Sequence, residues 1–212
     1  MKQVYLVRHG ESQSNAGGIV IGAEAPLTPR GVEQAKFIAE RISKLPVEAI
    51  VSSTMLRALQ TAQYISDVKN IRVETSDLFC ERINPQEQFG LTNTDPEYNR
   101  IEDLVNIRYG DEGYRFSNED TYADLNVRAQ KALFYLEERT EEHIAVVTHS
   151  VFVRALLATL LFGKNISGHE SKKIFRGFKT ANTGLTIFQH DTNNQLGHWR
   201  VVVWNDHAHL AD

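Results

Sequence analysis

The stretch Val4-Tyr5-Leu6-Val7-Arg8-His9-Gly10-Glu11-Ser12 decides the expected fold. Its first four residues are apolar and partly β-branched, and polar residues flank them, which is typical of a buried strand. The strand then delivers Arg8 and His9 to a loop, in which Gly10 allows a sharp turn. Ligands of open α/β sheets bind just beyond the carboxyl ends of strands. We therefore expect a cation and a titratable nucleophile at the place where such a fold carries out chemistry.

The composition is that of an ordinary globular protein. The chain has 212 residues, of which 42% are hydrophobic and 24% charged, and its formal net charge is −4. We expect one domain over residues 1–212, with an inserted cap. A negative chain is not suited to nucleic acid or to an anionic membrane surface, so we expect neither as a partner. Nothing in the sequence predicts the oligomeric state.

The sequence also indicates a reducing, cytoplasmic setting. The one cysteine, Cys80, excludes an intramolecular disulfide. Met1-Lys2-Gln3 leads directly into the first strand, which leaves no room for a signal peptide in this sequence. The longest apolar candidate, residues 155–162, is too short for a membrane span.

Strands and helices are expected to alternate along the chain. A helix begins at Thr28-Pro29, with Thr28 as N-cap, and another follows Ser52-Ser53, which can cap it. A further helix begins at Thr121, where Asp124 completes a capping box. Another covers Val151–Phe162 and ends at Gly163. The other expected strands are Ala49–Val51, Ile71–Glu74, Ile144–Val147, Thr183–Gln189 and Trp199–Trp204, the last two joined by a hairpin at Asp191–Asn194. This order predicts an α/β fold, a three-layer α/β/α sandwich with a mostly parallel mixed sheet and helices on both faces.

Three segments have no regular pattern. Residues 77–118 predict a cap or insertion with short helices, of the kind that carries substrate specificity or is locally mobile. The glycine-rich stretch Asn15–Gly22 is either a plain connection or a loop through which backbone approaches a ligand. His207-Ala208-His209 is interpreted as part of a disordered polar tail rather than as a metal-binding pair.

Two further residues point to the same edge of the sheet. Arg57 falls in the first turn of a helix, and helical side chains lean toward the N-terminus, so it reaches back toward a strand end. His149 follows Ile144–Val147, which repeats the arrangement at His9. Arginine binds phosphate with a planar fork, and a neutral histidine can attack phosphorus. With this much positive charge, including a protonated His149, we expect no metal and no cofactor, but a general acid is still required.

These motifs together resemble the histidine phosphatase superfamily, the phosphoglycerate mutase-like proteins. Arg8-His9-Gly10-Glu11-Ser12 with Asn15 is similar to the family signature. Leu27-Thr28 with Gly31 and Gln34-Ala35, then Ser52-Ser53 with Arg57-Ala58 and Gln60-Thr61-Ala62, and finally Thr148-His149-Ser150, resemble its later motifs in the same order. The resemblance is specific over residues 3–66, 119–128 and 144–156, and weak over 83–118 and after 165.

The resemblance implies a role for each matching residue. His9 would be the nucleophile that becomes phosphohistidine, and Arg8, Arg57 and His149 would hold the phosphoryl group. Asn15 would donate a further hydrogen bond. Glu81 matches the proton donor, although Asp77 and Glu87 are near enough in sequence to compete.

Three departures from the family pattern bear on the substrate. Glu81-Arg82 continues as Ile83-Asn84-Pro85, so the substrate loop of the mutases is missing. Ser150 stands where many members have glycine; its backbone remains able to contribute, but it makes the pocket edge bulkier. Arg82, Arg100 and Arg108 are only candidates for a second phosphate clamp.

The main hypothesis is therefore a metal-independent phosphomonoester hydrolase for a small phosphorylated substrate. The alternatives are a phosphoglycerate mutase and a phosphate- or phosphoprotein-binding module without turnover.

Overall fold

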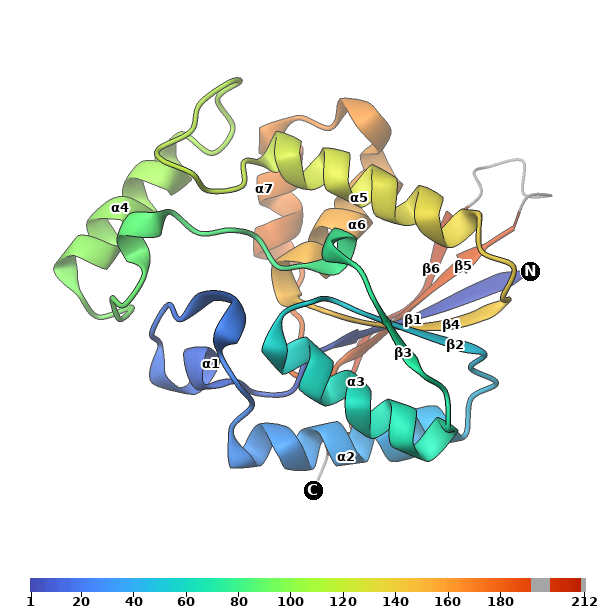
Figure 1. The fold of residues 1–212 in the computed structure, drawn as a ribbon. Coiled ribbons are helices and arrows are strands. Elements are labelled where there is room, and N and C mark those ends of the chain that lie inside the picture. Colours follow the sequence, from blue (N-terminus) through green and yellow to red (C-terminus); the bar gives the residue numbers. More distant parts are fainter. Residues whose placement is uncertain (192–198, 211–212) are drawn as a thin grey trace.

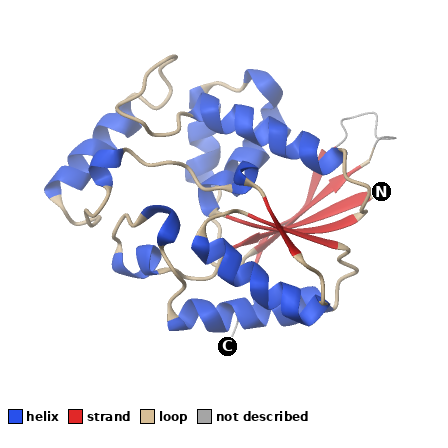
Figure 2. Ribbon diagram, viewed as in Figure 1, coloured by secondary structure: helices blue, strands red, loops and turns tan. Residues whose placement is uncertain are grey.

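A computed structural model of the chain describes residues 1–191 and 199–210. Its described part holds a six-stranded sheet in the order β3-β2-β4-β1-β5-β6 (Figures 1 and 2). The strands are β1 (Lys2–Arg8), β2 (Ala49–Ser52), β3 (Val73–Thr75), β4 (His143–Thr148), β5 (Leu185–His190) and β6 (Trp199–Asp206). The first four are parallel, and β5 runs antiparallel to both β1 and β6. The mostly parallel mixed sheet is thereby confirmed, with β3 shorter than the expected Ile71–Glu74.

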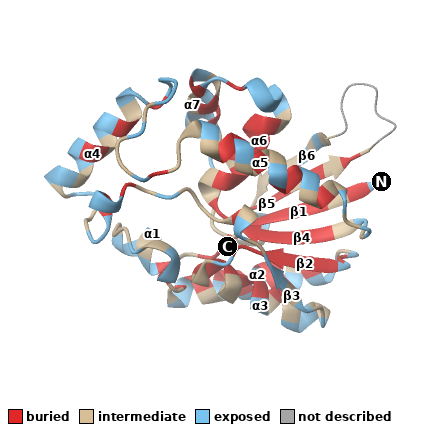
Figure 3. Cartoon of the chain, turned by 45° about the horizontal axis from the view of Figure 1, so that its top comes forward, coloured by how far each residue is buried: buried red, intermediate tan, exposed pale blue. Residues whose placement is uncertain are grey.

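Helices cover both faces of this sheet (Figure 1). Helices α2 (Pro29–Ser43) and α3 (Leu56–Lys69) lie on one face, and α5 (Tyr122–Glu137), α6 (Ser150–Phe162) and α7 (Gly168–Gly177) lie on the other. Figure 3 shows β1, β2 and β4 buried along most of their length. Each face has its own buried core, because β1 and β4 alternate their apolar side chains: Leu6 and Val146 belong to the α5–α7 side, and Val7 and Val147 to the α2–α3 side. The three-layer α/β/α prediction is confirmed.

The helix starts follow the sequence signals, with one exception. The hydroxyl of Thr28 accepts from the N–H of Gly31 at 3.0 Å, and Thr121 forms the expected capping box with Asp124. However, α3 begins only at Leu56, with Met55 as its N-cap. Ser52-Ser53 therefore does not cap it: Ser53 accepts from the Met55 N–H outside the helix, at 3.2 Å.

Gly10 is required for a different reason from the one expected. Its φ is not in the left-handed region, so the turn itself does not demand glycine. Instead, a Cβ on Gly10 would lie 2.4 Å from the carbonyl oxygen of Gly31, and a Cβ on Gly31 would lie 1.9 Å from that of Glu11. The two glycines thus allow the loop after β1 to pack directly against the start of α2.

The segment after β3, for which the sequence predicts a cap, is mostly short helices and turns. It contains two 3-10 turns, Asp77–Phe79 and Gln86–Gln88, and helix α4 (Pro96–Ile107), which lies near α1 (Gln13–Gly17) in Figure 1. The N–H groups of Gly90 and Asn93 bond to carbonyls of the Asn15–Gly22 stretch, each at 2.9 Å. Asn15–Gly22 is therefore no plain connection: it includes the end of α1 and supports this segment. Further 3-10 turns occur at Gly22–Glu24 and Gly163–Asn165.

The C-terminal segment differs from expectation. The antiparallel pairing of β5 with β6 agrees with a hairpin, whose expected turn residues 192–194 lie outside the described residues. Ala208–Leu210 forms a 3-10 turn, and the two ring nitrogens of His209 lie 3.0 Å from the Thr183 hydroxyl and 3.3 Å from Arg41. The prediction of a disordered tail is wrong for residues 207–210, because His209 binds to the body of the fold.

The described residues contain neither a metal-binding cluster nor a membrane-spanning helix. No group of three or more His, Cys, Asp and Glu side chains there is arranged to hold a metal ion. No helix among them is long and apolar enough to cross a membrane.

Candidate active site

The parallel register brings the two histidines together. Arg8 pairs with Thr148 across β1 and β4, and the His9 N–H continues the ladder to the Thr148 carbonyl at 2.9 Å. Consequently the rings of His9 and His149 lie with their centroids 5.0 Å apart. Both side chains are buried at the carboxyl edge of the sheet.

The orientation of His9 exposes one ring nitrogen as a base. Its Nδ1 lies 2.6 Å from the Gly10 carbonyl, which can only accept, so Nδ1 carries the proton. Nε2 is then unprotonated, and its lone pair accepts a hydrogen bond from Nε of Arg57 at 3.2 Å. Burial, followed by the charges of Arg57 and Arg8, holds the pKa of His9 well below its usual value. His9 is therefore neutral near pH 7, as a nitrogen nucleophile must be.

Arg57 and Arg8 provide positive charge without a carboxylate partner in the described chain. Arg57 Nη1 donates to the Gly22 carbonyl at 2.8 Å, and Arg8 Nη1 donates to the Thr180 carbonyl at 2.7 Å. Nε of Arg8 is buried with no hydrogen-bond partner among the described residues. Two buried guanidinium groups bound to neutral oxygens are suited to receiving an anion.

His149 is bound on one side only. Its Nε2 lies 2.8 Å from the hydroxyl oxygen of Ser53, and its buried Nδ1 has no partner in the described structure. Burial, then the neighbouring His9 and Arg57, lowers the pKa of His149 well below its usual value. This lowering disfavours the protonated form of His149 that the sequence predicts, because a cation there is desolvated beside two arginines.

Glu81 is placed at the N-terminus of α6. Its Oε1 accepts from the N–H groups of Phe152 and Arg82, at 3.1 and 3.0 Å, and its Oε2 accepts from that of Val151 at 3.1 Å. A helix N-terminus is a favourable place for a carboxylate. Oε2 accepts a single hydrogen bond, which leaves it a position for a transferable proton.

Glu81 and Arg57 line one cavity of about 690 Å³. We call it the active-site cavity because Arg57 also contacts His9, although Arg8, His9 and His149 are not among its lining residues. Its walls also include Asn15, Met55, Arg82, Phe89 and Tyr98. The competing carboxylates lie elsewhere: Asp77 bonds to Thr54 and lines a separate cavity, and Glu87 is exposed on a 3-10 turn. Of the three carboxylates, Glu81 alone lies on the cavity wall with Arg57.

The remaining expected residues divide into two groups. Asn15 and Arg82 line the active-site cavity, whereas Ser150 does not. The Ser150 hydroxyl accepts from Thr180 at 2.8 Å and supports the loop that binds Arg8. Arg100 and Arg108 form exposed ion pairs with Glu97 and Asp111, at 2.7 and 2.9 Å, and line neither cavity that Arg82 lines. They are not a clamp in this structure.

Several contacts at the site were not predicted from the sequence. Ser53 orients His149, the Thr180 carbonyl holds Arg8, and the Asn182 side chain donates to the His9 carbonyl at 3.1 Å. Thr180 and Asn182 lie between α7 and β5, where no motif marks them. Ser53 belongs to the motif Ser52-Ser53, whose sequence signal predicts only a helix cap.

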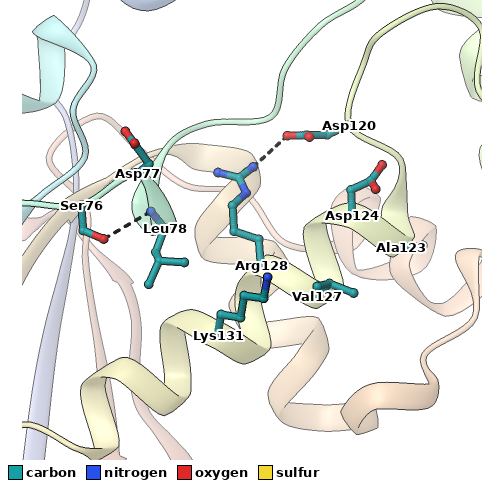
Figure 4. A pocket seen from close by; sticks show the side chains of 9 residues that line it. All are labelled: Ser76, Asp77, Leu78, Asp120, Ala123, Asp124, Val127, Arg128 and Lys131. Carbon is teal, nitrogen blue, oxygen red and sulfur yellow. Dashed lines mark hydrogen bonds and ion pairs between the residues drawn. The ribbon is translucent and has the colours of Figure 1, made fainter.

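The ion pair of Arg128 with Asp120 supports the backbone around Glu81. Arg128 Nη2 donates to the Glu81 carbonyl at 3.2 Å and to Asp120 at 2.8 Å, and Arg128 Nη1 donates to the Cys80 carbonyl. Asp120 in turn accepts from the Ile83 N–H at 3.0 Å. Figure 4 shows Arg128 reaching toward Asp120 at the wall of a cavity of about 530 Å³, outside the active-site cavity. The pair thereby fixes the segment that carries Glu81 on both sides of that residue.

Comparisons with known proteins identify the family. A model of the histidine phosphatase superfamily (branch 1) matches residues 4–207. The chain is 29% identical over 215 residues to a probable phosphoglycerate mutase, GpmB, of Yersinia pestis, with 99% of this chain and 95% of that protein covered. A mutant phosphoserine phosphatase from Entamoeba histolytica, in complex with phosphoserine, is 27% identical with a TM-score of 0.80, covering 99% and 100% of the two chains.

A further solved structure shares the fold. Bacillus stearothermophilus YhfR has a TM-score of 0.82 at 23% identity, covering 99% of each chain. The family model spans nearly the whole sequence, and residues of the matching motifs lie together at one edge of the sheet. This chain therefore belongs to the histidine phosphatase superfamily, branch 1.

Proposed function

We propose that this protein is a metal-independent phosphomonoester hydrolase that acts through a phosphohistidine at His9. The observation that carries the proposal is the state of His9: Nδ1 is fixed by the Gly10 carbonyl, and Nε2 keeps its lone pair beside Arg57. That arrangement suits nucleophilic attack on a phosphorus atom held by cations.

In the first step, the phosphoryl group of the substrate binds between Arg8, Arg57 and His149. Arg57 Nε leaves His9 and turns to a phosphoryl oxygen, which frees Nε2. Nε2 attacks phosphorus, and the bond from phosphorus to the ester oxygen breaks. The departing oxygen takes a proton from Glu81, so that a neutral alcohol is released.

In the second step, water replaces the alcohol. Glu81, now a carboxylate, removes a proton as the water oxygen attacks phosphorus. The bond from phosphorus to Nε2 breaks, which releases inorganic phosphate and restores His9. The positive charge that balances the phosphoryl oxygens comes from the two arginines, and no metal takes part.

Relatives support a small phosphorylated substrate. The Entamoeba histolytica phosphoserine phosphatase has been solved in complex with phosphoserine and with 3-phosphoglyceric acid, at 27% and 26% identity to this chain. The similarity to a probable phosphoglycerate mutase keeps phosphoryl transfer as a second candidate. The departure after Arg82, where the mutase loop is missing, favours hydrolysis.

The direct test is release of phosphate from p-nitrophenyl phosphate in the presence of EDTA. We expect turnover that EDTA does not abolish and that vanadate inhibits. Loss of activity in EDTA with recovery in magnesium or zinc would refute the metal-independent mechanism. No turnover of any phosphomonoester, with phosphate still bound, would indicate a binding module, and efficient conversion of phosphoglycerate with bisphosphoglycerate as primer would indicate a mutase.

A further inference from the structure

A second cavity of about 250 Å³ adjoins the candidate active site. It is enclosed by α4, the start of α6 and α7, and four cations line it: Arg82, Arg154, Lys172 and Arg176. We call it the basic cavity. Arg82 and Val151 line both this cavity and that of the active site, so the two adjoin along these residues.

The four cations have no ion-pair partner among the described residues. Their hydrogen bonds go to neutral oxygens instead: Arg82 to Asn84, Arg154 to the Phe175 carbonyl, and Lys172 to the Asn106 carbonyl. In addition, Nε of Arg82 is buried without a hydrogen-bond partner in the described structure.

The one carboxylate in the wall of the cavity, Glu102, does not pair with these cations in the described structure. The carboxylate of Glu102 accepts from Gln88 and Asn106, at 3.1 and 3.0 Å, rather than from a cation. Burial raises the pKa of Tyr109 to about 12, so its hydroxyl keeps its proton and can act as a donor. Burial is the main cause that lowers the pKa of Arg154; the charge of Glu81 opposes this lowering, and the charge of Arg82 adds to it. A bound anion would offset the cost of gathering these cations.

A short chain of hydrogen bonds links this cavity to the phosphoryl site. Arg154 Nη2 donates to the Ser150 hydroxyl at 3.2 Å, Thr180 donates to the same oxygen at 2.8 Å, and the Thr180 carbonyl accepts from Arg8 at 2.7 Å. The residue that departs from the family glycine, Ser150, is thus the junction between the two groups of cations.

We propose that the basic cavity binds a second anionic group, a carboxylate or a phosphate, of the same substrate whose phosphoryl group is transferred to His9. This inference rests on the proposed function and narrows its substrate class to phosphomonoesters with an acidic alcohol portion. The wall shared through Arg82 and Val151 favours one substrate bridging both cavities over an independent anion. Of the three candidate residues for a second clamp, only Arg82 lies in this cavity; the other cations come from α6 and α7.

The test compares substrates that differ in one anionic group. One pair is 3-phosphoglycerate and glycerol 3-phosphate, and a longer pair is fructose 1,6-bisphosphate and fructose 6-phosphate. The measured quantity is the ratio of kcat/KM for the member with the second anionic group to kcat/KM for the member without it. We expect a ratio of about 10 to 100 in at least one pair, since charge-assisted hydrogen bonds are the stronger class.

The Lys172→Met/Arg176→Met double variant should bring that ratio to about one, because methionine keeps the side-chain bulk and removes the charge. Lys173→Met, at an exposed neighbouring position of α7 that does not line the cavity, is the matched control and should leave the ratio unchanged. A wild-type ratio near one in both pairs overturns the proposal, as does a ratio that the double variant leaves intact.

Calorimetry with the His9→Ala variant separates this proposal from the proposed function. We expect the anionic members to bind His9→Ala more tightly than their partners, and to lose this preference when Lys172→Met and Arg176→Met are added. That result supports the anion subsite even if the wild-type chain shows no turnover. Turnover without any such preference leaves the hydrolase and removes the subsite. A second equivalent of inorganic phosphate that binds independently of the substrate, lost in the double variant, would identify a separate anion site and overturn the bridging substrate.

Discussion

Nε2 of His149 lies 2.8 Å from the hydroxyl oxygen of Ser53, so this contact engages one of the two ring nitrogens. Because Nε2 is engaged, the unpartnered Nδ1 is the nitrogen left for a phosphoryl oxygen. Ser53 therefore acts on the site through the orientation of a histidine, although it contributes no charge of its own.

Ser53→Ala should weaken phosphate binding without removing the nucleophile. A net hydrogen bond is worth about 0.5–1.5 kcal/mol, so we expect the inhibition constant of inorganic phosphate to rise roughly 2- to 10-fold. Phosphate inhibition measured with p-nitrophenyl phosphate checks this. Ser43→Ala, at an exposed helix end, is the control. Unchanged phosphate inhibition in Ser53→Ala would show that the ring keeps its orientation without this contact.

His9→Ala should lose nearly all turnover, because the proposed intermediate forms on Nε2 of His9, the nitrogen left unprotonated by the Nδ1 contact with the Gly10 carbonyl. Trapping with a labelled substrate and quenching in base should show an acid-labile, base-stable phosphate on His9 of the unmodified chain. Label on a serine, or substantial turnover in His9→Ala, would contradict the assignment of the nucleophile.

Glu81→Gln should slow turnover in proportion to how much the leaving group needs a proton. General acid catalysis contributes about 10²–10⁴-fold, so that loss is expected for sugar phosphates. With p-nitrophenyl phosphate the phosphorylation burst should lose much less, although the later hydrolysis step also uses Glu81. The variant keeps one oxygen acceptor at the start of α6, and its thermal midpoint serves as the check on folding.

An equal loss in the burst phase for both kinds of substrate would mean that Glu81 is not the proton donor. Asp77→Asn and Glu87→Gln are the comparison variants for that outcome. Both side chains lie off the active-site cavity, so we expect little change in either.

Arg128→Met should behave as a weaker copy of Glu81→Gln, because it removes the bonds that hold the Cys80 and Glu81 carbonyls. We expect kcat for sugar phosphates to fall about 10-fold, with a smaller loss in the p-nitrophenyl phosphate burst. In the double variant with Glu81→Gln the two losses should not add, since both act on one step.

Arg115→Met provides the control for Arg128. Arg115 also pairs with a carboxylate, Asp124, at 2.7 Å, but that pair is exposed and does not contact the Glu81 segment. Such pairs contribute little to stability, so activity should not change. Additive losses for Arg128 and Glu81, or equal losses across leaving groups, would assign Arg128 a purely structural role.

The two buried histidines should make the protein less stable in mild acid. Their pKa values in the fold lie well below 6.5, so below about pH 6.5 the unfolded chain binds protons that the folded chain does not. The free energy of unfolding therefore falls as the pH drops from about 6.5, by up to about 1.4 kcal/mol per pH unit for each histidine. Urea unfolding between pH 5 and 7.5 measures the slope.

His9→Asn should reduce that slope, because one of the two proton-binding differences is removed. A slope equal to that of the unmodified chain would mean that His9 is protonated in the fold, and would count against its role as a nucleophile in mild acid.

The sequence alone determined the layered fold and the principal residues of the candidate site. Buried runs such as Val4–Val7 and Ile144–Val147 have no stable place except a covered parallel sheet, and helices of 3.6 periodicity between them must lie on its faces. Because carboxyl ends of parallel strands meet at one edge, residues that follow such strands converge there. This is why Arg8, His9 and His149 were identifiable from local pattern.

Only the tertiary structure decided how those side chains are oriented and what surrounds them. The Thr180 and Asn182 contacts come from a loop more than 170 residues from His9 with no motif of its own, and Ser53 was identifiable only as a helix cap. Arg82, Arg154 and Lys172 lie on separate segments, so that their shared cavity has no sequence signature. Likewise the lowered pKa of His149 follows from desolvation, which depends on everything packed around a residue and on nothing in its immediate sequence.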